Sequence, residues 1–242
     1  MIECVAPAWP VRGVRVYTTT RDGGVSRGPY ASLNLGTHVG DSPEDVLANR
    51  TRLGQALGLP SAPRWLNQVH GSRVVDARRV ESALDADGSV TSESRLVCAI
   101  LTADCLPIVL ADRQARCIAV LHGGWRGLAA GIIEAGVTAL PVSSSELVAW
   151  LGPAIGPLHY EVGEPVRAAF KDGAQAAFRA IGEGRYQADL YALARVHLAA
   201  CGISEVYGGG YDTLSDPRFY SYRQTQVCGR MATLAWIEGH SP

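Results

Sequence analysis

The chain contains 242 residues, of which 47% are hydrophobic and 19% are charged, and its formal net charge is −1 at pH 7. This balance leaves no basic surface that could replace the counterions of a nucleic acid, so we expect no nucleic-acid partner. The length suffices for one sizeable core and no linker is visible, so we predict a single domain over residues 1–242.

The N-terminal segment MIECVAPAWPVRG lacks the basic stretch and apolar core of a signal peptide. No later apolar run approaches the roughly 20 residues that cross a bilayer. We therefore expect a cytoplasmic protein without a membrane partner. The six cysteines are scattered and include no CxxC pair, so they are predicted to be free thiols in a reducing compartment.

Eight segments are predicted to form β-strands. Several are nearly continuous apolar runs, as expected of strands that are covered on both faces. In chain order they are residues 14–20, 64–77, 95–103, 106–112, 116–123, 146–153, 204–210 and 230–237.

Four helices are predicted between these strands. The first covers residues 42–58, with Ser42 as its N-cap, Pro43 at its first position and Gly58 at its end. The others have apolar residues at spacings of three and four, and residues 83–94 are predicted to be a long surface loop. This mixture predicts a layered α/β sandwich with a mixed β-sheet; the three further helices are residues 127–140, 164–182 and 189–202.

The segment LTADCLPIVLADRQARCIAVLHGGWRG, residues 101–127, contains two candidate functional residues. Cys105 lies at an irregular corner between two predicted strands, and His122 ends the next strand. Residues at the ends of buried strands face crevices more often than a uniform core. The glycines after His122, the following helix and Arg126 could together bind a phosphate or a carboxylate, although such a turn is also a common structural connection.

A third candidate is His70, at the end of a short predicted strand in LNQVHGSRV. The amides of Asn67 and Gln68 could orient its imidazole or face solvent. If His70 converges with Cys105 and His122, the three form a ligand set that zinc accepts with an open fourth position, and copper accepts it too. Spacing alone favours an ordinary structural role for each residue.

Longer motifs change this balance. They are SLNLGTHVGD with Asn49 and Arg50, NQVHG, TADCLPI, HGGWRGLAAGI, LGPAIGP with YEVG, and FYSYR with GRMATL. Together they run over nearly the whole chain. With these motifs the sequence resembles the YfiH-like family, also described as multicopper polyphenol oxidases, purine nucleoside phosphorylases and peptidoglycan editing factor.

The resemblance implies a mixed α/β sandwich and a catalytic zinc site formed by His70, Cys105 and His122. It also implies phosphorolysis of adenosine, inosine, guanosine and methylthioadenosine, deamination of adenosine, and a link to the editing of peptidoglycan precursors. Purine nucleosides and phosphate would then be the partners. The predicted substrate contacts are Asn34, His38, Arg50, Arg126 and Arg223.

Some positions depart from the family pattern. None is a proposed ligand and Gly123 should be tolerated, whereas Asp212 and the pair Gln224 and Thr225 bear on the shape of the pocket, and hence on substrate preference. The family usually has alanine where Gly123 stands, and many members have cysteines at the positions of Leu158 and His159 and before Thr213. The departures are Gly123, Leu158, His159, Asp212, Gln224 and Thr225.

Three alternatives stay open. Cys105 could be the nucleophile of a metal-free hydrolase, activated by His122 or His70. The older family name suggests copper-dependent phenol oxidation, but the chain lacks the additional histidine pairs of a multicopper cluster. A non-enzymatic, metal-stapled module that binds cell-wall enzymes is the third.

Overall fold

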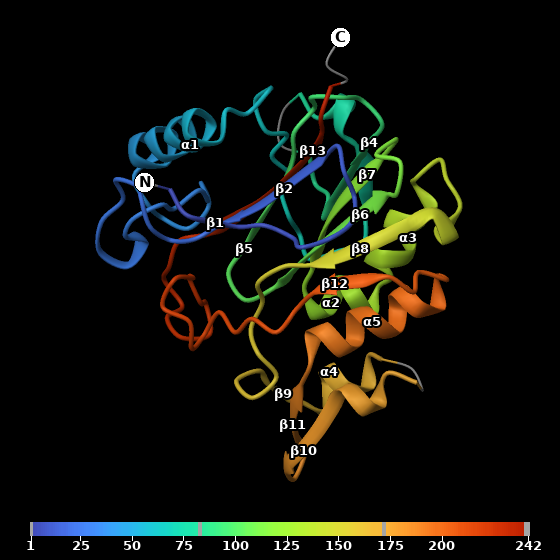
Figure 1. The fold of residues 1–242 in the computed structure, drawn as a ribbon. Helices are drawn as coiled ribbons and strands as arrows, with labels where there is room; N and C mark the ends of the chain where they lie inside the picture. Colours follow the sequence, from blue (N-terminus) through green and yellow to red (C-terminus); the bar gives the residue numbers. More distant parts are fainter. Residues whose placement is uncertain (1, 82–83, 171–172, 240–242) are drawn as a thin grey trace.

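A computed structural model describes residues 2–81, 84–170 and 173–239 (Figure 1). Its largest sheet has six strands in the order β12-β8-β6-β7-β4-β3 and is mixed, because β12 with β8 and β3 with β4 pair in parallel while the other neighbours are antiparallel. These strands are β12 (Val206–Gly208), β8 (Leu147–Leu151), β6 (Leu106–Asp112), β7 (Ile118–Gly123), β4 (Gly88–Thr91) and β3 (Val74–Asp76).

A second sheet of four antiparallel strands packs on one face of the first. Its order is β1-β2-β13-β5, with β1 (Cys4–Val5), β2 (Val14–Thr19), β13 (Met231–Ile237) and β5 (Cys98–Thr102). A third sheet is a small antiparallel one in the order β10-β11-β9, with β10 (Phe178–Gly182), β11 (Arg185–Ala188) and β9 (Glu161–Gly163).

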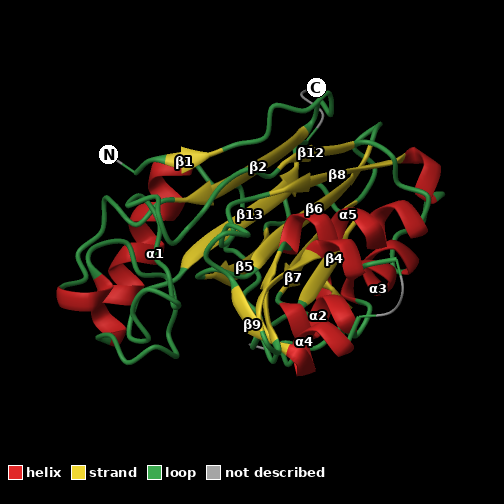
Figure 2. Ribbon diagram, turned by 90° about the horizontal axis from the view of Figure 1, so that it is seen from below, coloured by secondary structure: helices red, strands yellow, loops and turns green. Residues whose placement is uncertain are grey.

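Side-chain alternation along the strands builds the layers. On β6, Val109 and Ala111 pack toward the four-stranded sheet, while Ile108 and Leu110 pack toward helices on the other face. Those helices are α2 (Trp125–Ala129), α3 (Ile132–Thr138) and α5 (Leu190–Ala200), and α1 (Pro43–Leu57) packs on the outer face of the four-stranded sheet. Figure 2 shows the two sheets between α1 and the other helices, so the predicted layered α/β sandwich is confirmed.

The predicted first helix is confirmed as α1, and its caps explain its limits. The side chain of Ser42 accepts a hydrogen bond from the backbone N–H of Asp45, and Gly58 ends the helix in the left-handed conformation. No helix among the described residues is long and apolar enough to cross a membrane.

The predicted loop over residues 83–94 is wrong for its middle part, and residue 83 lies outside the described residues. Although this segment is polar, residues 88–91 form β4, which is inserted between β3 and β7. Gly88 is required there because a Cβ atom would lie 2.6 Å from a methyl group of Leu121. Pairing with two neighbours, rather than local composition, makes this segment a strand.

The predicted helix over residues 164–182 is also wrong. Only α4 (Glu164–Ala168) is helical at its start, and the segment ends in a single 3₁₀ turn over residues 175–177 and strand β10. Residues 171–172 lie outside the described part. The apolar residues of this segment are nevertheless buried, since Phe170, Ala177 and Phe178 join the core beneath α5. Pairing with β11 makes residues 178–182 a strand.

Two further segments are divided where a single element was predicted. Residues 127–140 form two helices that separate at Gly131, whose φ is +87°. Of residues 64–77, only 74–76 form a strand, and Arg64 and Asn67 make isolated bridges. His70 has a φ of +60° and therefore sits in a turn, not at the end of a strand.

Candidate metal centre

The structure brings His70, Cys105 and His122 together. Their ligand atoms all lie within 4.8 Å of one another, and the two imidazole rings are 4.8 Å apart at an angle of 75°. Within the described ranges, this is the only group of three or more histidine, cysteine or acidic residues so close.

Strand pairing accounts for two of the three positions. β6 and β7 are antiparallel neighbours, with Leu106 opposite Gly123 and Pro107 opposite His122. Cys105, immediately before β6, therefore lies at the same edge of the sheet as His122. His70 reaches this edge from the turn that precedes β3.

The turn that carries His70 is held by Asp87, a residue that the sequence analysis did not single out. Its fully buried carboxylate accepts hydrogen bonds from the backbone N–H groups of Val69 (3.2 Å), His70 (2.9 Å) and Gly71 (2.7 Å). Its Oδ1 atom also lies 2.8 Å from Nδ1 of His122. Asp87 thus fixes the backbone at one histidine and the ring of another, and it directs Nε2 of His122 toward Cys105.

The amide of Gln68 supports the same turn from the other side. Its Nε2 donates to the carbonyl oxygen of Leu101 at 2.8 Å, and its Oε1 accepts from the N–H of Leu101 at 2.7 Å. Gln68 therefore ties the turn to β5 and does not orient an imidazole directly. Asn67 donates to Asp85 at 2.5 Å.

Gly124 leaves room for the three side chains. A Cβ atom at this position would lie 3.1 Å from Sγ of Cys105, 3.3 Å from a ring carbon of His70 and 3.9 Å from one of His122. Glycine at this position therefore lets the backbone approach the centre closely.

Cys105 and His122 shift each other's pKa at the centre. Burial alone would raise the pKa of Cys105, but the charge and hydrogen bonds of His122 and His70 outweigh it and lower the pKa to about 6. Burial would lower the pKa of His122, whereas the negative sulfur of Cys105 and the hydrogen bond to Asp87 raise it to about 9. A thiolate and two imidazoles in reach of one point fit a zinc ion, which takes both donor types, and His122 has the carboxylate partner that is common for ligating histidines.

The centre opens into a cavity of about 500 Å³. His38, Arg126 and Arg223, three of the five predicted substrate contacts, line this cavity. Three lining residues that the sequence analysis did not single out are Tyr160, Tyr222 and Arg230. The signal was present in the motifs YEVG, FYSYR and GRMATL, which contain them.

Asn34 and Arg50 are not among the residues that line this cavity. The amide of Asn34 is fully buried and accepts hydrogen bonds from the backbone N–H groups of Gly36 and Arg230, both at 2.9 Å. The guanidinium of Arg50 donates twice to the carbonyl oxygen of Leu35, at 3.0 and 2.8 Å, and stacks on Trp65. In this structure both side chains bind the loop around residues 34–36.

Two departures from the family pattern contact each other. Nδ1 of His159 is hydrogen-bonded to Oδ2 of Asp212, which also accepts a hydrogen bond from the hydroxyl of Ser215 at 2.8 Å. Oδ1 of Asp212 accepts from the N–H of Gly156 at 2.8 Å. These contacts join the loops at residues 156–159 and 212–215.

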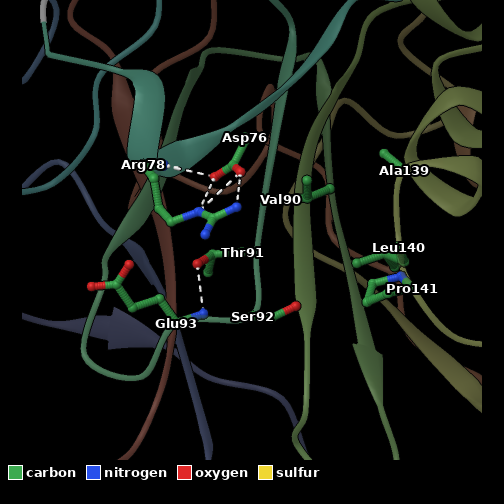
Figure 3. A pocket seen from close by; sticks show the side chains of 9 residues that line it. All are labelled: Asp76, Arg78, Val90, Thr91, Ser92, Glu93, Ala139, Leu140 and Pro141. Atoms are coloured by element: carbon green, nitrogen blue, oxygen red, sulfur yellow. Dashed lines mark hydrogen bonds and ion pairs between the residues drawn. The ribbon is translucent and has the colours of Figure 1, made fainter.

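A separate pocket of about 430 Å³ lies beside β3 and β4 (Figure 3). The guanidinium of Arg78 contacts the carboxylate of Asp76 at 2.5 Å, and the hydroxyl of Thr91 accepts a hydrogen bond from the backbone N–H of Glu93 at 2.9 Å. Among the described residues, the pocket presents no set of convergent ligand groups comparable to the centre.

Comparisons with known proteins give consistent results. A family model described as multi-copper polyphenol oxidoreductase laccase matches residues 15–238. A Pseudomonas aeruginosa protein named purine nucleoside phosphorylase is 48% identical over 97% of this chain and 98% of its own length. The Escherichia coli protein named purine nucleoside phosphorylase YfiH is 44% identical over 98% of this chain and 100% of its own length.

Solved structures share the fold over nearly the full length. A Neisseria meningitidis protein superposes with a TM-score of 0.94 at 45% identity and covers 98% of this chain and 99% of its own. The protein YlmD of Geobacillus stearothermophilus superposes with a TM-score of 0.89 at 30% identity and covers 96% of this chain and 94% of its own.

Proposed function

The chain belongs to the YfiH-like family, whose model is described as multi-copper polyphenol oxidoreductase laccase, and from this premise we propose that it is a zinc-dependent purine nucleoside phosphorylase. We propose adenosine, inosine, guanosine and methylthioadenosine as substrates and deamination of adenosine as a second activity. The observation that carries the proposal is the convergence of His70, Cys105 and His122 at a cavity lined by arginines.

We assign His70, Cys105 and His122 as the zinc ligands and as the catalytic centre. Three protein ligands leave the fourth position of zinc open, which distinguishes catalytic from structural sites. When bound, zinc would supply Lewis-acid polarisation of a substrate atom. Asp87 orients His122 through Nδ1, as the carboxylate partner of a ligating histidine commonly does.

The remaining chemistry is positioning of the reactants. In phosphorolysis a phosphate oxygen bonds to the anomeric carbon, the bond from that carbon to the purine nitrogen breaks, and the base leaves with the electron pair and takes up a proton. Arg126 and Arg223, whose side chains line the cavity, would contact the substrates. Trp125 and Tyr222 present aromatic surface for a purine.

His38, a neutral imidazole, completes the proposed substrate pocket. Burial and the charges of Arg230 and Arg50 lower the pKa of His38, so it can both donate and accept a hydrogen bond. For Asn34 and Arg50 we propose an indirect part in substrate binding, through the loop that they hold. We further propose that residues 1–242 act as one domain, and a link to peptidoglycan editing remains a prediction of the resemblance.

The word multi-copper in the family name has no counterpart in the described residues. A multicopper cluster needs additional histidine pairs, whereas only one group of potential ligands converges here. We therefore propose zinc as the metal.

One observation favours a second candidate, a metal-free cysteine hydrolase. Cys105, His122 and Asp87 are arranged as nucleophile, base and orienting carboxylate, with 2.8 Å between Nδ1 of His122 and Oδ1 of Asp87. Metal analysis separates the two candidates, since one tightly bound zinc ion per chain would occupy the thiolate and leave no nucleophile.

The test is an assay of zinc-loaded protein with adenosine, with and without inorganic phosphate, that resolves adenine, ribose 1-phosphate and inosine. We expect adenine and ribose 1-phosphate only when phosphate is present, and inosine in both conditions. If none of the three products forms, the proposed nucleoside activity is wrong. Chelated protein that has lost its zinc and is then reloaded serves as the control.

A further inference from the structure

The cationic residues around the cavity are not equivalent. The Cζ atom of Arg223 lies 5.3 Å from the ring centroid of Tyr160, and the Cζ atom of Arg126 lies 4.5 Å from that of Trp125. Burial and the charge of Cys105 raise the pKa of Tyr160, and the charges of Arg223 and Arg126 both oppose this rise. Arg126, Arg223 and Tyr160 all line the cavity into which Cys105 opens.

These two arginines also have unused donors. Among the described residues, the guanidinium of Arg126 makes no hydrogen bond or ion pair, and that of Arg223 donates only from Nη1, to the carbonyl oxygen of Glu161 at 3.0 Å. A guanidinium that keeps free, planar donors can bind two oxygens of one oxyanion.

The cavity has one further arginine. Nη1 of Arg230 donates to the carbonyl oxygens of Cys228 (2.9 Å) and Gly229 (3.0 Å). Within the described residues, Arg230 therefore makes two hydrogen bonds to backbone carbonyls, against one for Arg223 and none for Arg126.

Asp104 connects Arg223 to the metal centre. Asp104 immediately precedes Cys105, and its carboxylate accepts hydrogen bonds from the N–H of Arg223 (2.7 Å) and the hydroxyl of Thr213 (2.6 Å). Its carbonyl oxygen accepts from the N–H of Ile155 at 3.0 Å. Asp104 is only 9% exposed and has a φ of +85°, a left-handed conformation uncommon outside glycine.

We propose that Arg126 and Arg223, beside Tyr160, form the subsite for inorganic phosphate, and that Asp104 is the positioning residue that fixes Arg223 relative to Cys105. The inference rests on the proposed function and specifies where its second substrate binds. Because the carboxylate holds the backbone of Arg223 and not its guanidinium, the donors of Arg223 stay free for the ligand. The same carboxylate borders Cys105, so the phosphate subsite and the metal centre share one rigid corner.

The test measures binding of inorganic phosphate to zinc-loaded protein by isothermal titration calorimetry, without nucleoside. Loss of a charge-assisted contact commonly weakens binding about ten-fold or more, and we expect this for Arg223→Gln, Arg126→Gln and Asp104→Ala. Asp104→Asn keeps an acceptor for the N–H of Arg223, so it should restore most of the affinity. Zinc content should stay at one per chain in all four variants.

Asp216 and Arg218 provide matched controls. Asp216 accepts the backbone N–H of Arg218 at 3.0 Å, the same contact that joins Asp104 to Arg223, but neither residue lines the cavity. Asp216→Ala and Arg218→Gln should therefore bind phosphate as the wild type does.

Steady-state kinetics distinguish a positioning role of Asp104 from a general loss of structure in the variant. In Asp104→Ala the KM for phosphate should rise about ten-fold or more, while the KM for the nucleoside changes little. Equal rises in both constants, or a phosphate affinity equal to that of the wild type, would overturn the role of Asp104. If Asp104→Ala does not fold, Thr213→Val, which removes one contact of the same carboxylate, takes its place with an expected rise of a few-fold.

Failure of the inference can be told from failure of the proposed function. If the wild type binds phosphate and Arg223→Gln does not, but no nucleoside is cleaved, the subsite stands and the proposed reaction is wrong. If nucleosides are phosphorolysed and Arg126→Gln and Arg223→Gln keep the wild-type affinity for phosphate, the subsite is wrong and the proposed reaction stands.

Discussion

At each end of the β6–β7 pair a buried carboxylate accepts hydrogen bonds from backbone N–H groups, but the two carboxylates serve different purposes. At one end, the buried carboxylate of Asp87 accepts three backbone N–H groups and orients His122. At the other end, the buried carboxylate of Asp112 accepts the N–H groups of Gln114 (3.2 Å) and Arg116 (3.0 Å) and two hydrogen bonds from the guanidinium of Arg116.

The difference lies in where the donors come from. Asp112 binds residues two and four positions away, so it closes a hairpin. Asp87 binds residues 16 to 18 positions earlier and a histidine 35 positions later, so it joins separate parts of the chain. A local carboxylate stabilises a turn, whereas this non-local one assembles a centre. The following predictions test that contrast, in order of their expected effect on zinc binding and turnover.

Cys105→Ala should have the largest effect. Removal of one of the three proposed zinc ligands should abolish stoichiometric zinc binding and reduce turnover about a thousand-fold or more. Zinc content by atomic emission and the nucleoside assay measure both effects. Cys117→Ala is the matched control, because Cys117 is a buried thiol near the hairpin end that packs in the core; if it lost zinc equally, the centre would be placed wrongly.

Asp87→Asn should have the next largest effect. The asparagine leaves His122 without its charged partner and removes acceptor capacity for the turn at residues 69–71, so zinc affinity should fall about 10- to 100-fold. Competition with a chromogenic chelator measures this change. An unchanged affinity would mean that Asp87 serves the fold alone, as Asp112 does.

Gly124→Ala should have a smaller effect on the same measurement. The added Cβ atom would lie 3.1 Å from Sγ of Cys105, and the sulfur must shift by a few tenths of an ångström. We expect zinc affinity to fall roughly three- to ten-fold, since a displacement of about 1 Å can cost about 100-fold at a reacting centre. Gly54→Ala, at an open helical position of α1, is the control that should leave the affinity unchanged.

Asp112→Asn should leave zinc affinity and turnover unchanged and lower stability. Its carboxylate is fully buried while Arg116 is half-exposed, so we expect a loss of about 1–2 kcal/mol in the free energy of unfolding. Urea denaturation of zinc-loaded protein measures it. A loss of turnover without a loss of stability would contradict the distinction between the two carboxylates.

The pH dependence of this last variant has a definite sign. Hydrogen bonds from Arg116 hold the pKa of Asp112 below its ordinary value of 3.8. The contribution of the Asp112 carboxylate to the free energy of unfolding is therefore complete above about pH 4 and is lost as the pH falls through its folded-state pKa. The stability difference between the wild type and Asp112→Asn should be constant near neutral pH and should shrink below about pH 4.

Much of the fold follows from local signals in the sequence. Apolar runs identified β5, β6, β7 and β8, and the Ser42, Pro43 and Gly58 signals identified α1 with both of its caps. By contrast, β4 was missed because its residues are small and polar, and β10 was missed because its apolar spacing suits a helix. In both cases pairing with a neighbouring strand overrides local preference.

By itself, the sequence singled out three candidate residues: Cys105 beside a corner, His122 before two glycines, and His70 in the motif NQVHG. Only the tertiary structure decided that the three converge and that Asp87 contacts both histidines. It also decided that the side chains of Asn34 and Arg50 bind the loop around residues 34–36, while Arg230 lines the cavity. The physical reason is the separation in sequence between the residues that contact each other. Caps and turns join residues a few positions apart, whereas the hydrogen bonds of Asp87 and Asp104 join segments that only strand pairing brings together.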